Sequence, residues 1–157
     1  MKRYAILPAL WLSLSAGAPP PETANKPAPV AKLGDVTITV TNLRNADGVV
    51  RACMTSTKKS FPKCRGVDGV HSATVKAHEG KLLLMFKDVR PGSYAIALLH
   101  DENANGKADR ALGMMPREGF GFSRDAPVRM GPPKFDDAVF EVGGQHHDMT
   151  IKMRYML

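Results

Sequence analysis

Short segments in which apolar and polar residues alternate constrain the fold of this chain more than any other feature. The clearest lies at residues 36–40, where Val36, Ile38 and Val40 alternate with threonines. Alternation with a period of two places one face of a strand on a core and the other face in solvent. The segments that we expect to be strands are residues 36–40, 49–54, 70–77, 81–86, 93–100, 137–142 and 149–156. About seven short strands separated by turn sequences predict an all-β fold, a single antiparallel β-sandwich.

The composition divides the chain into three parts. Residues 1–18 begin with basic residues, continue with an apolar run and end in small residues, which is the order of a secretory signal peptide. Cleavage after residue 15, 17 or 18 fits the sequence. The alternative to a cleaved signal peptide is an uncleaved membrane tether. Residues 19–32 are predicted to be a Pro-rich linker, and residues 33–157 one β-sandwich domain with a single core. No later segment approaches the roughly 20 apolar residues of a transmembrane helix.

The charge of the chain narrows the class of partner. The formal net charge is +7, and the mature chain stays mildly basic because the signal peptide removes only Lys2 and Arg3. The basic residues are scattered and few aromatic residues lie among them, so we expect no nucleic-acid partner. We expect an exported protein, in the periplasm or at the cell surface. Its partner is unknown, and if the basic charge serves in binding, we expect that partner to be polyanionic.

The two cysteines, Cys53 and Cys64, agree with export. A small even number of cysteines outside the cytoplasm usually forms disulfides. We therefore predict one disulfide that closes a polar surface loop, worth roughly 3 kcal/mol at most.

An acidic loop follows the run at residues 93–100. Oxygen-bearing side chains occupy loop positions 1, 3, 5 and 9, and Gly106 occupies position 6, as in calcium-binding loops. Position 12 is Leu112 rather than a bidentate glutamate, so this is not a helix–loop–helix calcium sensor. The predicted calcium ligands are the side chains of Asp101, Asn103, Asn105 and Asp109, the carbonyl of Lys107 and the carboxylate of Glu118. The alternative is a rigid turn whose acids are solvated.

Residues 110–136 break the strand pattern with many glycines and prolines, so we predict one long irregular loop. Within it, Phe120 and Phe122 stand between glycines, beside Glu118. We expect the two rings to close the open end of the sandwich.

Several motifs occur together in the order found in one bacterial family. They are Pro91-Gly92-Ser93-Tyr94, His100-Asp101-Glu102-Asn103, Asn105-Gly106, Asp109, Pro116, Glu118-Gly119-Phe120-Gly121-Phe122-Ser123, Pro133, Phe135 and Ala138. Over residues 36–155 the chain resembles the exported family called domain of unknown function 2141. The resemblance implies an immunoglobulin-like or transthyretin-like sandwich with no established activity. The acidic loop also resembles the calcium loops in B-type repeats of surface adhesins, which are modules rather than enzymes.

Three classes of function follow. We favour an exported, non-enzymatic β-sandwich module, stabilised by calcium, that acts in binding or adhesion. The alternative is a carrier of a small apolar ligand or a metal ion, suggested by nine methionines, although methionine more often fills core gaps. An enzyme is less favoured, because the chain lacks G-x-S-x-G and H-E-x-x-H patterns and adjacent His146 and His147 would face opposite sides of a strand.

Overall fold

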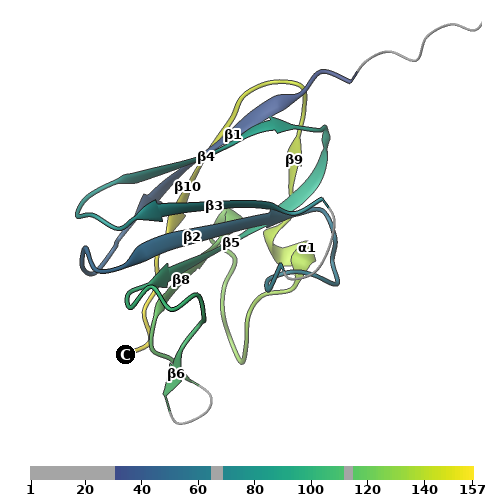
Figure 1. Cartoon of the computed structure of the whole chain (residues 1–157). Coiled ribbons are helices and arrows are strands. Elements are labelled where there is room, and N and C mark those ends of the chain that lie inside the picture. The colour runs from purple at the N-terminus through teal and green to yellow at the C-terminus, as the bar shows by residue number, and fades with distance from the viewer. Residues whose placement is uncertain (1–30, 65–68, 112–114) are drawn as a thin grey trace, which may run out of the picture.

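The strands of this computed structural model form two main sheets that pack face to face, and residues 110–111 and 115–116 form a separate two-stranded sheet. The structure describes residues 31–64, 69–111 and 115–157, so the predicted signal peptide and residues 19–30 of the predicted linker lie outside the described residues. The smaller sheet has the strand order β10-β1-β4, and the larger has the order β3-β2-β5-β8, with β9 paired to the start of β5. Figure 1 shows β1 and β4 stacked above β2, β3 and β5. The predicted all-β sandwich is confirmed.

The elements of both sheets are short. The strands are β1 Gly34–Thr41, β2 Val49–Thr55, β3 His71–Lys76, β4 Leu82–Val89, β5 Gly92–Asp101, β6 Arg110–Ala111, β7 Met115–Pro116, β8 Gly119–Phe122, β9 Phe140–Val142 and β10 His147–Lys152. A 3-10 turn, η1, spans Ser123–Asp125, and a single helical turn, α1, spans Phe135–Ala138. Among these described elements, none is a helix long and apolar enough to cross a membrane.

Aliphatic side chains fill the space between the sheets. In β1, alternate residues Val36, Ile38 and Val40 are completely buried, and the threonines between them are not. In β2, Val50 and Met54 are completely buried in the same cluster. The alternation seen in the sequence therefore divides both strands between a core face and an outer face.

One pairing departs from the predicted antiparallel arrangement. The first strand, β1, runs parallel to the last, β10, with Val36 opposite His147. Only antiparallel neighbours can be joined by a tight turn, and these two strands are far apart in the sequence. No hairpin therefore fixes their relative direction.

The long loop predicted over residues 110–136 contains a strand, β8, that pairs with β5. The sequence pattern missed it because Gly119 and Gly121 were interpreted as breakers. Both glycines face the core side, where a Cβ on Gly119 would collide with the ring of Tyr155 and one on Gly121 would lie 2.8 Å from Ile151. Glycine in a strand often marks such a close approach.

The predicted position of Phe120 and Phe122 is wrong. Because the glycines of β8 face the core, these rings point to the outer face of the larger sheet instead of closing the end of the sandwich. There Phe122 packs with Phe135 and Ala138 of α1 in a second hydrophobic cluster, against which Phe120 packs in turn.

The prediction of a strand over residues 137–142 is wrong in its first part. Phe135–Ala138 form a helical turn in which the carboxylate of Asp137 accepts the backbone N–H of Lys134 at 3.1 Å. The carbonyl of Ala138 accepts the hydroxyl of Ser123, which ties α1 to η1. The last strand, predicted at 149–156, ends at Lys152.

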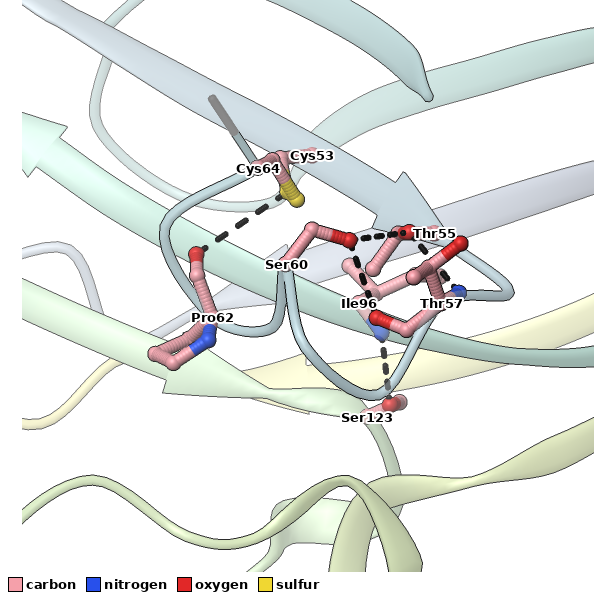
Figure 2. Close-up of a disulfide and its surroundings, with 8 residues drawn as sticks. All are labelled: Cys53, Thr55, Thr57, Ser60, Pro62, Cys64, Ile96 and Ser123. Atoms are coloured by element: carbon pink, nitrogen blue, oxygen red, sulfur yellow. Dashed lines mark hydrogen bonds between the residues drawn. A yellow bond between two sulfur atoms is a disulfide. The ribbon is translucent and has the colours of Figure 1, made fainter. Parts of the chain in front are cut away.

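A disulfide joins Cys53 of β2 to Cys64, as predicted, with Cα atoms 6.2 Å apart. Figure 2 shows the loop between them folded back on the strand, where the hydroxyl groups of Thr55 and Ser60 lie 3.0 Å apart in a hydrogen bond. The hydroxyl of Ser60 also donates to the carbonyl of Thr57. The disulfide loop is thus held against the outer face of the larger sheet.

We predict that Gly119→Ala lowers the free energy of unfolding by about 1–3 kcal/mol, the usual cost of overpacking a filled site. The added Cβ would meet a rigid aromatic ring rather than a flexible side-chain end. The matched control is Gly143→Ala, where a Cβ has nothing within 4 Å. Urea denaturation of the three proteins measures the difference, and equal stability of both variants would contradict the assignment of β8.

Candidate functional site

An open groove of about 1070 Å³ lies on the outer face of the larger sheet. Two rows of side chains that cross β3, β2, β5 and β8 form its floor. One row is Thr74, Arg51, Leu99 and Phe120, and the other is Ser72, Cys53, Ala97 and Phe122. Residues opposite each other in a register lie side by side on one face of a sheet. The floor is therefore set by the hydrogen-bonded strands themselves.

Three segments rise around this floor. They are the disulfide loop at Pro62 and Lys63, the acidic loop with β6 and β7, and residues 128–132 after η1. Figure 1 shows β6 and α1 on the side of the larger sheet opposite β1 and β4. The walls are loops and the floor is regular sheet, an arrangement common in binding sites.

Our sequence interpretation did not find this groove, although a signal was present. Between Tyr94 and Leu99 the chain is apolar at every position, not at alternate ones. Ile96 and Leu98 belong to the core between the sheets, whereas Ala97 and Leu99 line the groove. A run of apolar residues without alternation indicates a strand covered on both faces.

The acidic loop begins at the end of β5, where the carboxylate of Asp101 is completely buried. Its Oδ1 accepts the backbone N–H of Asn105 at 3.0 Å, and its Oδ2 accepts the N–H of Gly106 at 2.8 Å and Nε–H of Arg51 at 2.7 Å. Burial acts to raise the pKa of Asp101, but these hydrogen bonds and the charge of Arg51 outweigh it and hold the pKa below its usual value. Asp101 is thus the anchor of the loop.

The remaining predicted ligands join the same hydrogen-bonded loop. The side-chain amides of Asn103 and Asn105 donate to the carboxylate of Asp109 at 2.8 and 2.9 Å. The backbone N–H of Asp109 donates to Oε2 of Glu118 at 3.0 Å. Lys107 takes part through its N–H, which donates to Oδ1 of Asn105. The fold therefore connects four predicted side-chain ligands within residues 101–109 to the fifth, Glu118.

Glu118 has a buried side-chain oxygen without a partner in the part of the chain that the structure describes. The residue is 5 % exposed, and its Oε1 has no hydrogen-bond partner among the described residues. Burial raises the pKa of Glu118, and the charges of Asp101, Asp109 and Glu102 raise it further. An unpaired carboxylate oxygen in a buried acidic setting is costly unless a cation or a proton meets it.

The fit of this loop to calcium is partial. Across residues 31–64, 69–111 and 115–157, no three histidine, cysteine or acidic side chains form a group that could hold a metal ion. Both oxygens of Asp101 already accept hydrogen bonds, and Asn103 and Asn105 turn their amide nitrogens toward Asp109. Glu118 and Asp109, with the amide oxygens after side-chain rotation, are the donors that would hold an ion.

His100 lies on the other side of the same strand end and is completely buried. Its Nε2–H donates to the carbonyl of Asp47 at 2.9 Å, and its Nδ1 accepts the hydroxyl of Tyr155 at 2.7 Å. Arg44 lies 4.6 Å from the ring centroid of Tyr155 and forms a two-pronged ion pair with Glu102. Both ring nitrogens of His100 are occupied, so the imidazole supports the end of β5.

A family model described as "Uncharacterized protein conserved in bacteria" (DUF2141) matches residues 38–150. The chain belongs to this family. The predicted resemblance to domain of unknown function 2141 is therefore confirmed, and the match includes the acidic loop and the floor of the groove. No curated protein matches this DUF2141 chain, and no solved structure matches it.

Proposed function

We propose that this DUF2141 protein is an exported, non-enzymatic binding module of the bacterial envelope whose ligand occupies the groove on the larger sheet. The observation that carries the proposal is an apolar hollow of about 1070 Å³ over a floor of regular strands. Sites for small molecules are concave, mostly apolar and largely formed in advance, with volumes of roughly 300–1,000 Å³. The groove is concave and mostly apolar, and its volume is close to the upper end of this range.

The disulfide supports the exported location. Disulfides persist mainly in oxidising compartments such as the periplasm and the cell exterior. The bond between Cys53 and Cys64 also has a direct part in the groove, because both residues line it. A protein that builds its ligand site around a disulfide works best where that bond stays oxidised.

The surroundings of the histidines support a role in binding instead of catalysis. General base catalysis requires a ring nitrogen within hydrogen-bond reach of the substrate. Both nitrogens of His100 have protein partners, and none of the five histidines lines the groove. The polar groups of the groove are mainly cationic side chains at its edge, which suit recognition of a ligand more than proton transfer.

Native mass spectrometry of the protein purified from its own envelope tests this proposal. We expect wild-type protein to retain an organic molecule that Leu99→Lys loses, because the lysine would place a charge on the apolar floor. Leu83→Lys is the matched control, since Leu83 is 63 % exposed on the smaller sheet and lies outside the groove. Retention of the same molecule by all three proteins, or of no molecule by any of them, would contradict the proposal.

A calcium-stabilised acidic loop is the second candidate function, favoured by the unpaired Oε1 of Glu118. A cation there would offset the charges of Asp101 and Asp109, which raise the pKa of Glu118. Few charged ligands are present, so the affinity should resemble that of extracellular calcium modules, about 10⁻⁴–10⁻³ M. Calcium at about ten times the dissociation constant would then add roughly 1.4 kcal/mol of stability.

Glu118→Gln tests the calcium site. Because the pKa of Glu118 is raised by folding, the folded state binds its proton more tightly, and stability is lost as the pH rises through that pKa. In chelator near pH 7 the variant should therefore melt above wild type, and this advantage should vanish in acid. Calcium should raise the melting temperature of wild type by several degrees and leave the variant unchanged.

The control for this measurement is Glu79→Gln, an exposed acid in the turn before β4 that should keep the full calcium shift. Asp101→Asn is less suitable, because it would also remove the partner of Arg51 and loosen the loop without calcium. If calcium does not change the melting temperature of the wild-type protein, the loop is a rigid turn held by hydrogen bonds alone.

A further inference from the structure

We propose that the groove binds a single-chain amphiphile with an anionic head group, namely an unbranched fatty acid. Its alkyl chain would lie on the apolar floor and its carboxylate would meet the basic edge. This inference rests on the proposed function, since it names the chemical class of the ligand in the same groove. Three features of the groove lead to it: the floor, the methionines of the rim and the charge of the rim.

The floor offers a continuous apolar path. Leu99 and Phe120 pair across β5 and β8, and Ala97 and Phe122 pair beside them in the next row. Ala97, Leu99 and Phe120 are partly exposed, so an alkyl chain can lie on them. No acidic side chain belongs to either row of the floor. Burying such a surface under methylene groups is favourable because apolar area leaves water.

Exposed methionines stand around this floor. Met115, Met130 and Met156 line the groove and are 40 %, 105 % and 47 % exposed. A soluble protein gains nothing by holding such side chains in water, and clusters of exposed apolar residues mark interaction sites. Methionine is flexible and polarisable, so these side chains can fold over a chain of variable shape. They fit a linear hydrocarbon better than a rigid, polar ligand.

The charge of the rim selects an anion. Within the described residues, Lys63, Lys107, Arg110 and Arg129 line the groove and have no ion-pair partner. The fifth basic residue, Arg51, is already bound to Asp101.

The four cations outnumber the two acids of the groove, Asp109 and Glu118. Asp109 accepts the amides of Asn103 and Asn105, and Glu118 is almost completely buried below the rim. Four free cations beside an apolar floor complement a ligand that is a hydrocarbon with an anionic end. A small inorganic anion would leave the floor unused, and a cationic amphiphile would face repulsion from all four side chains.

Isothermal titration calorimetry with dodecanoate, kept below its micelle concentration, tests the inference on the full mature chain. We expect dodecanoate to bind one molecule per chain, and dodecyltrimethylammonium and acetate to bind far more weakly. Dodecyltrimethylammonium has the wrong charge, and acetate lacks the alkyl chain. The double variant Lys63→Glu/Arg129→Glu should weaken dodecanoate binding by about tenfold or more.

The matched control is Lys81→Glu/Lys87→Glu, which makes the same charge change at exposed residues outside the groove and should bind as wild type does. Circular dichroism confirms the fold of each variant. Equal affinity for both amphiphiles, or an undiminished affinity in the groove double variant, would overturn recognition of the anionic head.

Failure of this inference can be told apart from failure of the proposed function. If dodecanoate does not bind while native mass spectrometry still shows an organic molecule that Leu99→Lys loses, the ligand class is wrong and the groove remains a site. If the protein sediments with phosphatidylglycerol vesicles but does not bind monomeric dodecanoate, the partner is a membrane surface and the fatty-acid assignment is overturned. Dimerisation that Leu99→Lys abolishes would make the groove an interface between copies and overturn it as well.

Discussion

The buried carboxylate of Asp101 is the constraint on which the face with the groove and the acidic loop depends. A buried charge is costly unless hydrogen bonds and an opposite charge surround it, and here two backbone N–H groups and Arg51 supply them. To donate those N–H groups, the chain must turn sharply after β5, and Gly106 permits the turn with a φ of 76°. The direction in which the acidic loop leaves the sheet follows from this one group.

The same anchor joins the loop to the groove. Arg51 reaches Asp101 from β2, so the ion pair links the floor of the groove to the start of its wall. Further along, the hydrogen bond from Asp109 to Glu118 ties the loop to the beginning of β8, where Phe120 enters the floor. The acidic loop can therefore support the proposed ligand site whether or not it binds calcium. The two candidate functions share one scaffold and need not exclude each other.

Sequence reasoning predicted the parts of the fold that depend on local pattern. The alternation in β1 and β2, the cysteine pair and the family motifs all belonged to this class. Sequence reasoning failed where contacts between residues distant in sequence decide the structure. Gly119 permits a strand because Tyr155 packs on it, and no local sequence pattern reveals this contact. The groove was missed because the apolar run in β5 covers both faces of the strand, and the second face packs under loops distant in sequence. The predicted ligands of the acidic loop do converge, but the role of Arg51 as their counter-charge could not be predicted without the register of β2 and β5.

A crystal structure of the protein purified from its own envelope, without added lipid, tests the central claim most directly. We predict elongated electron density on the floor beside Leu99 and Phe120, with its polar end toward Lys63 or Arg129. A groove filled only by ordered water or by another copy of the chain would contradict the claim. So would ligand density on the smaller sheet beside Leu83 and Met85, where apolar side chains are also exposed.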